Sequence, residues 1–98
     1  MTTPPPGHKF PAGQTRATQA AMQAMQQAGH IASEFLARHV QGDWGDHDPE
    51  QKAQNDTNLQ TGGPLHSIYR LSDGQELWVF TEADRSTTTL LLPSDNDG

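Results

Sequence analysis

The segment that most constrains the fold is E-L-W-V-F-T-E at residues 76–82. Its residues favour β structure, and because successive side chains of a strand point to opposite sides, its apolar groups fall on both faces. A strand with two apolar faces is typical of the centre of a sheet. The sequence therefore predicts a sheet in which this segment is an inner strand.

Two further β-rich segments lie close to this strand in the sequence. L-H-S-I-Y-R-L at residues 65–71 precedes it across S-D-G, where Gly74 can adopt the positive φ of a hairpin turn. T-T-T-L-L-L at residues 87–92 follows the polar loop 83–86 and ends before Pro93. Three strands joined by short connections predict a C-terminal antiparallel meander.

The first half of the chain has helical periodicity. Q-A-A-M-Q-A-M-Q-Q-A at residues 19–28 consists of strong helix formers, with Thr18 as its N-cap and Gly29 at its end. A second helix is predicted over residues 31–40 from an apolar stripe at helical spacing. The stripe consists of Ile31, Phe35, Leu36, His39 and Val40.

A third helix is predicted to begin at Asp48 and to end at residues 61–63. Asp48 is a good N-cap, Pro49 suits the first helical position, and Gln51 completes a capping box. The helix is polar nearly all round, so we expect it on the surface with a narrow contact. Its apolar anchors would be Ala53 and Leu59.

These elements predict an α+β fold, in which two or three helices pack on one face of a three- to four-stranded, mostly antiparallel sheet. The short segment 13–18 is a candidate for an additional edge strand. A single domain is expected over residues 10–93. A disordered lead at residues 1–9, which contains three prolines in a row, and a frayed tail at residues 94–98 would flank it.

The charge balance narrows the class of partner. Twelve acidic residues against six Lys and Arg give a net charge of -6, the wrong sign for a phosphate backbone, so direct nucleic-acid binding is not expected. No cysteine is present, which excludes disulfides, thiolate metal sites and cysteine nucleophiles. With neither an apolar run of membrane-spanning length nor the pattern of a signal peptide, the chain is expected in the cytoplasm without membrane contact.

The loop G-D-W-G-D at residues 42–46 contains three candidate binding residues, Asp43, Trp44 and Asp46. Several acids and a histidine surround it, but a calcium loop starting at Asp46 would need glycine where Gln51 stands and glutamate where Thr57 stands. We therefore predict no metal site. Trp44 lies between two glycines and either closes over the helices as part of the core or is an exposed anchor for a partner.

The turn T-E-A-D-R at residues 81–85 contains the other three candidates, Glu82, Asp84 and Arg85. Paired carboxylates at a strand end could serve hydrolytic chemistry. However, the metal-dependent nuclease pattern needs a lysine, and the two lysines are Lys9 and Lys52, far from this segment. The structural alternative is that Asp84 caps the turn. We assign no catalytic residue and expect no cofactor.

Longer stretches of the chain carry a family resemblance. E-F-L-A-R-H-V-Q-G-D-W-G-D-H-D-P-E-Q-K-A-Q-N-D, L-H-S-I-Y-R-L and E-L-W-V-F-T-E-A-D-R-S-T-T-T-L-L-L-P resemble a family of small plasmid-related proteins of unknown function, often labelled "type I restriction endonuclease subunit M". The resemblance covers roughly residues 10–93, departs from the usual pattern in the third helix, and implies carriage on mobile genetic elements. Its matched residues are Arg38, His39, Gly42, Asp43, Trp44, Gly45, Asp46, Asn55, Glu82, Ala83, Asp84 and Arg85.

The label itself does not fit the chain, because a methyltransferase needs a glycine-rich cofactor motif and an N-P-P-aromatic motif that this sequence lacks. We instead expect a small, acidic, non-enzymatic protein that binds a host protein, such as a defence or nucleic-acid-processing factor. The alternative is a minimal enzyme or a nucleotide- or metal-binding module, which would require residues 42–46 and 81–85 to converge on one cleft. A structural homodimer is a third alternative.

Overall fold

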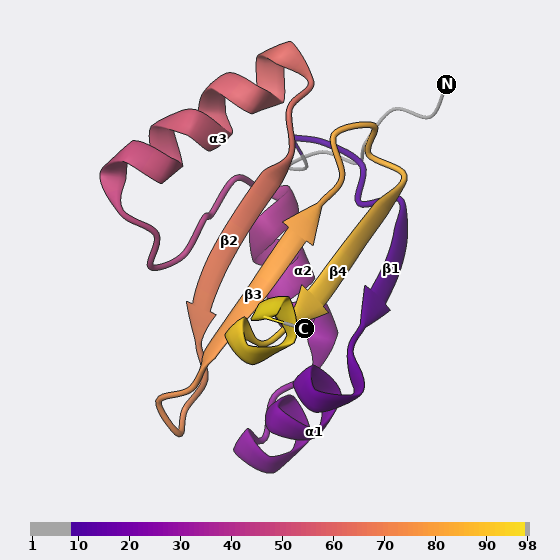
Figure 1. Cartoon of the computed structure of the whole chain (residues 1–98), viewed down its shortest axis with the longest axis vertical. Helices are drawn as coiled ribbons and strands as arrows, with labels where there is room; N and C mark the ends of the chain where they lie inside the picture. Colours follow the sequence, from indigo (N-terminus) through magenta and orange to yellow (C-terminus); the bar gives the residue numbers. More distant parts are fainter. Residues whose placement is uncertain (1–8, 98) are drawn as a thin grey trace.

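The computed structural model describes residues 9–97 of the chain. Its elements are β1 (Gln14–Ala17), α1 (Gln19–Ala28), α2 (Ala32–Val40), α3 (Pro49–Thr61), β2 (Leu65–Arg70), β3 (Glu76–Thr81), β4 (Thr87–Leu91) and the 3-10 helix η1 (Pro93–Asp97). The strands form a mixed sheet in the order β1-β4-β3-β2, with β1 parallel to β4 and the other neighbours antiparallel (Figure 1). The α+β fold, the inner strand, the meander and the edge strand are thus confirmed.

One face of the sheet is covered by α1 and α2 (Figure 1). Leu77 and Val79 point from β3 into this side and are fully buried, which is the alternation that the sequence of the strand predicts. The main core is built from both helices and three strands. It comprises Ala21, Ala24, Met25, Phe35, Tyr69, Leu71, Leu77, Val79 and Leu90. The prediction that helices cover one face of the sheet is therefore confirmed for α1 and α2.

Helices α1 and α3 begin at the predicted caps. Thr18 Oγ1 accepts a hydrogen bond from the N–H of Ala21 at 3.1 Å, and Asp48 Oδ1 accepts one from the N–H of Gln51 at 2.7 Å. The side chain of Gln51 donates to Asn55 Oδ1 at 3.2 Å instead of turning back to Asp48. The capping box predicted for α3 is therefore only half formed.

Helix α2 begins at Ala32, one residue later than predicted. Ile31 is its N-cap, with an extended φ of -120°, and the N–H of Ile31 donates to the Glu34 carboxylate at 3.2 Å. The Ile31 side chain is 66% exposed, so its predicted place in the apolar stripe is wrong. A residue outside the helical geometry does not follow the helical spacing. The buried members of the stripe are Phe35, His39 and Val40.

Helix α3 lies beside β2 (Figure 1) and is held there by a buried amide. Asn55 Nδ2 donates to the carbonyl oxygen of His66 at 2.7 Å, and Asn55 Oδ1 accepts from the N–H of His66 at 3.3 Å. The side chain thus pairs with the outer edge of β2 as a neighbouring strand would. The surface position of α3 agrees with the prediction, but the anchor differs, because Ala53 is exposed and Leu59 is only partly buried.

The ends of the described chain are tied to the domain. Lys9 donates its N–H to the carbonyl oxygen of Val40 at 2.6 Å, while the rest of the predicted lead, residues 1–8, lies outside the described residues, as does Gly98. Where a frayed tail is predicted, η1 lies in front of β3 and β4 (Figure 1). The Asp95 carboxylate accepts from the Thr18 hydroxyl at 2.7 Å. No helix within residues 9–97 is long and apolar enough to cross a membrane.

Candidate functional site

Trp44, the candidate between two glycines, lies in the core. It is 4% exposed and stacks on Phe10, with 6.2 Å between the ring centroids. Its indole N–H donates to the Asp56 carboxylate at 3.1 Å, so the one polar atom of the ring has a partner. His39 contacts the same ring edge-on at 5.6 Å. Of the two interpretations of Trp44, the structure therefore supports the one in which it closes over the helices.

The backbone of the G-D-W-G-D loop runs along the outer edge of β2. Ile68 donates its N–H to the carbonyl oxygen of Trp44 at 3.2 Å, and the N–H of Asp46 donates to the carbonyl oxygen of Ile68 at 2.7 Å. Gly45, between them, has φ 72°, and a Cβ there would lie 1.9 Å from the Ile68 oxygen. Glycine is therefore required by this close approach. The Asp46 carboxylate lies on the surface, 3.7 Å from Arg70 Nε.

Asp43 holds the start of the same loop. Its carboxylate accepts from Arg38 Nε at 2.7 Å and from the N–H of Gly45 at 3.0 Å. Its carbonyl oxygen accepts from the Tyr69 hydroxyl at 2.6 Å, and the Arg38 guanidinium lies 4.5 Å from the centroid of the Tyr69 ring. The hydrogen bond from Arg38 lowers the pKa of Asp43. The candidate acid Asp43 is thus part of a network that fixes the loop to the sheet.

Arg85 fastens the T-E-A-D-R turn to the end of α3. Its guanidinium donates to the carbonyl oxygens of Gly63 at 2.6 Å and Asn58 at 3.0 Å. Its Cζ also lies 5.7 Å from the centroid of the Phe10 ring. Arg85 and Trp44 therefore contact the same phenylalanine, and the two predicted loops are neighbours through a packed core residue rather than across a cleft.

The acids of this turn lie apart from those of the loop. Asp84 Oδ1 accepts from the N–H of Ser86 at 2.9 Å, which confirms its predicted capping role, and the hydrogen bonds from Ser86 lower the pKa of Asp84. Glu82 and Asp84 line a hollow of about 480 Å³ together with Ala83, Ser86 and Thr87, and no residue of the loop 42–46 lines it. Within residues 9–97 no cluster of three or more histidine or acidic side chains could hold a metal ion.

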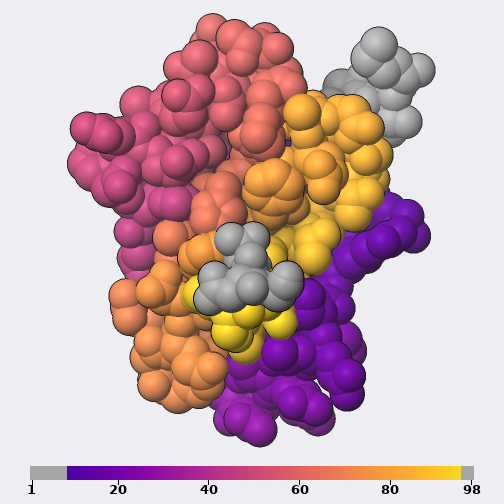
Figure 2. Space-filling view, in the orientation of Figure 1, coloured from indigo at the N-terminus to yellow at the C-terminus, as the bar shows by residue number. Residues whose placement is uncertain are grey.

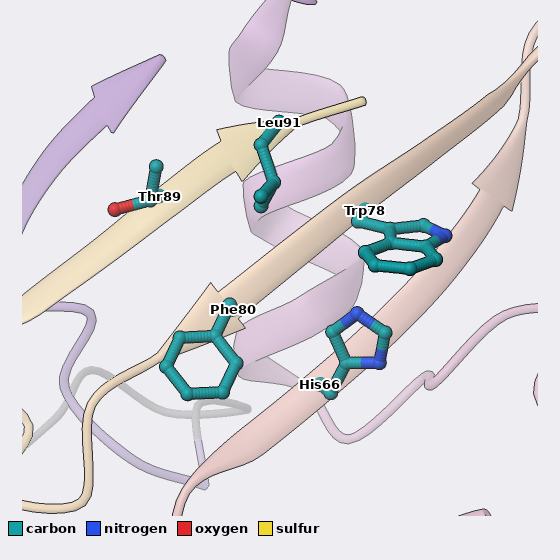
Figure 3. A pocket seen from close by; sticks show the side chains of 5 residues that line it. All are labelled: His66, Trp78, Phe80, Thr89 and Leu91. Carbon is teal, nitrogen blue, oxygen red and sulfur yellow. The ribbon is translucent and has the colours of Figure 1, made fainter. Parts of the chain in front are cut away.

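A second hollow lies on the sheet face opposite α1 and α2, which we call the open face. It has a volume of about 420 Å³ and mostly apolar walls. Figure 3 shows its lining side chains on one side of β2, β3 and β4, namely His66, Trp78, Phe80, Thr89 and Leu91. Figure 2 shows the same face in space-filling form, with α3 along one side. None of these residues is a candidate that the sequence predicts, since all six candidates lie in the two loops.

The two hollows lie on the same face of the sheet. Along β3, alternation places Glu76, Trp78, Phe80 and Glu82 on the open face, so two aromatic residues have an acid on either side. The N–H of Glu82 donates to the carbonyl oxygen of Thr87 at 3.0 Å, which continues the pairing of β3 with β4. The hollow lined by Trp78 and Phe80, which we call the aromatic hollow, therefore continues along β3 toward the hollow lined by Glu82 and Asp84, which we call the acidic hollow.

A pair of histidines borders the aromatic hollow. Nε2 of His47 lies 2.6 Å from Nδ1 of His66, so one ring donates its proton to the other. His66 in turn contacts the Trp78 ring edge-on, with 4.9 Å between centroids. Burial lowers the pKa of His66 to about 4, and the nearby His47 acts in the same direction. At neutral pH His66 therefore contributes an uncharged ring to the hollow.

The sheet face under α1 and α2, which we call the covered face, holds a serine–histidine pair that sequence patterns do not indicate. Nδ1 of His39 lies 2.6 Å from Ser67 Oγ, and Nε2 lies 2.8 Å from Thr81 Oγ1. The Thr81 hydroxyl is 2.8 Å from that of Thr88, which donates to the carbonyl oxygen of Ala12. Each hydroxyl has one proton, so Thr81 donates to Thr88 and accepts from His39, and the Ser67 hydroxyl donates to His39 Nδ1.

This buried chain is a structural feature of the core. His39 and Ser67 are both fully buried, so no substrate reaches the serine oxygen. Burial lowers the pKa of His39 to about 3, which keeps the ring neutral. Every buried polar side-chain atom in this series of hydrogen bonds has a partner within the described residues, so His39 and Ser67 cannot serve as a nucleophilic dyad in this conformation.

Comparison with known proteins adds no assignment: no family model, no curated protein and no solved structure matches the chain.

Proposed function

We propose that the protein is a small, non-enzymatic interaction protein that binds a partner protein on the open face of its sheet. The observation that carries the proposal is the pair Trp78 and Phe80, which line a mostly apolar hollow on a face that α1 and α2 leave uncovered. Large aromatic residues dominate the binding energy of protein interfaces. As the family resemblance implies, the partner would be a host protein met by a mobile genetic element.

The charge around the open face favours a protein over a nucleic acid. Glu82 and Asp84 line the hollow at one end of the aromatic pair, whereas Glu76, at the other end, lies opposite Arg70 in the register of β2 and β3. Aromatic residues on a sheet can stack on bases, but that mode of binding requires a positively charged surface for the backbone. The net charge of -6 has the opposite sign.

The contacts of the predicted candidates support a non-enzymatic role. Asp43 is bonded to Arg38 and Gly45, and Arg85 is bonded to carbonyl oxygens of the α3 end. Both side chains hold loops in place and leave little freedom for acid–base chemistry. Glu82 and Asp84 line the surface hollow and remain in the proposed binding surface.

A comparison of two double variants tests the proposal. Trp78→Ala with Phe80→Ala removes the aromatic pair, whereas Met22→Ala with Ile31→Ala removes the large exposed apolar side chains outside the open face, which are 58% and 66% exposed. Each purified variant captures proteins from a bacterial lysate at physiological salt. Mass spectrometry identifies the captured proteins, and titration calorimetry then measures direct binding to the recombinant partner.

We expect the open-face variant to lose more than about tenfold in affinity and the control variant to bind like the wild type. Circular dichroism checks that both variants are folded. A partner that binds both variants equally, or the absence of any partner at physiological salt, would contradict the proposal.

A further inference from the structure

We propose that the element bound on the open face is an amphipathic α-helix of the partner, with an apolar stripe over the Trp78–Phe80 hollow and a Lys or Arg that reaches Glu82 and Asp84. This inference rests on the proposed function and specifies the partner's chemistry. The aromatic hollow and the acidic hollow lie on the same sheet face, one continuing toward the other along β3.

A helix suits the face of a sheet better than an extended segment. The N–H and C=O groups of β2, β3 and β4 point within the sheet toward neighbouring strands and are paired there. An extended segment lying on the face would find no partners for its own backbone, and burying unpaired backbone groups is costly. A helix satisfies its backbone internally and buries only its apolar stripe.

The spacing along β3 sets where the basic residue lies. At about 3.3 Å per residue, Glu82 lies about 7 Å from Phe80 and about 13 Å from Trp78. A helix rises about 5.4 Å per turn, so these distances correspond to one or two turns. A Lys or Arg one or two turns from the apolar anchors would therefore reach the acidic hollow.

The acidic hollow keeps its negative charge in the free protein. The guanidinium of Arg85, the nearest cation in sequence, is directed to the carbonyl oxygens of Gly63 and Asn58. Hydrogen bonds from Ser86 lower the pKa of Asp84, which holds it charged at neutral pH. Glu82 is exposed. A cationic side chain is the complement of this end of the surface.

A second copy of this chain offers no such helix among its described elements. Most apolar residues of α1 and α2 are packed in their own core, as Met25 and Phe35 illustrate, and the one large exposed apolar side chain of α1, Met22, does not by itself form an apolar stripe. The residues of α3 that face solvent are polar or small, and its buried member is Asn55. The partner is therefore a different protein.

Selection from a peptide library tests the inference directly. A phage library of random 16-residue peptides is selected on the full chain and counter-selected on two open-face variants, the Trp78→Ala/Phe80→Ala double variant and Thr89→Arg. Thr89→Arg blocks the hollow without removing an aromatic side chain, so one blocked surface remains if the double variant does not fold. Light scattering measures the oligomeric state of the wild type and of both variants.

We expect the enriched peptides to carry apolar residues at helical spacing and a Lys or Arg one or two turns away, and to gain helical circular dichroism on binding. Glu82→Gln should weaken their binding about two- to fivefold at low salt and less at high salt, while the matched exposed variant Glu50→Gln should not.

Each other outcome overturns a defined part of the account. Enriched peptides that lack a basic residue, bind without becoming helical, or ignore Glu82→Gln overturn the helix inference and leave the proposed binding face standing. Failure to enrich any peptide that depends on the open face overturns both. A wild-type dimer that Thr89→Arg dissociates identifies a second copy as the occupant and overturns the inference.

Discussion

The two faces of the sheet differ in their unusual side chains. The covered face has polar side chains inside the apolar core, and the open face has aromatic side chains that are partly exposed. The covered face, under α1 and α2, holds the neutral ring of His39 bonded to Ser67 and Thr81 amid the apolar core. The open face holds Trp78 and Phe80. Buried polar groups with complete hydrogen bonds help to define a unique arrangement. Aromatic side chains that the fold leaves partly exposed are available to a partner. The difference separates residues that specify the fold from those proposed to bind.

Of the comparisons between the two faces, truncating one side chain on each side of β3 should give the largest difference in the free energy of unfolding. Leu77→Ala leaves a cavity in the covered face and should lower the free energy of unfolding by about 2–5 kcal/mol. Phe80→Ala, on the open face, should cost less, about 1–2 kcal/mol, because part of its side chain stays exposed. Urea denaturation measures both values. Equal costs would mean that the open face is as tightly packed as the covered one.

Acidification should lower the stability of the protein through His39 on the covered face. The pKa of His39 is about 3 in the folded protein, below the ordinary value of 6.5, so the unfolded chain takes up the proton first. The free energy of unfolding should therefore fall as the pH drops below 6.5, by up to about 1.4 kcal/mol per pH unit from His39. The lowered pKa of His66 acts in the same direction.

Urea denaturation between pH 7.5 and pH 4.5 tests this dependence. We expect little contribution from these histidines above pH 6.5 and a growing loss of stability below it. A free energy of unfolding that stays constant from pH 6.5 to pH 4.5 would contradict a neutral, buried His39.

Removing one hydroxyl group from each face should give a smaller difference in the free energy of unfolding than the two truncations on β3. Thr81→Val removes the acceptor of His39 and the donor to Thr88 from the covered face, which should cost about 1–3 kcal/mol. Thr89→Val, on the open face, is the matched control and should change the free energy of unfolding by less than about 0.5 kcal/mol. Thermal denaturation of the two variants makes the comparison. A Thr81→Val variant as stable as the control would show that the buried chain contributes nothing to stability.

Much of the fold could be predicted from local patterns. The two apolar faces of residues 76–82 identify β3 as an inner strand, and Thr18 and Asp48 mark the starts of α1 and α3. These signals act within a few residues and do not depend on distant contacts. The anchor of α3 could not be predicted in this way, because Asn55 bonds to His66, on a strand that follows a separate turn.

The open face could not be predicted for a related reason. The sequence predicts that the helices cover one face of the sheet, but the apolar groups on both sides of β3 do not show which of them stay on the other face. Trp78 and Phe80 are the signal in the sequence, because they are the large aromatic side chains on one side of this strand. The G-D-W-G-D loop has the more unusual composition, and its contacts explain that composition structurally, through the packing of Trp44 and the close approach at Gly45.

The most direct test of the contrast between a covered and an open face is the accessibility of the two tryptophans. Trp44→Phe leaves only Trp78, and Trp78→Phe leaves only Trp44. Acrylamide quenching of each dilute variant measures how readily solvent reaches the remaining ring. We predict stronger quenching and longer-wavelength emission for the protein that keeps Trp78. Stronger quenching of Trp44, or equal protection of both rings, would contradict the assignment of the open face as the surface available to a partner.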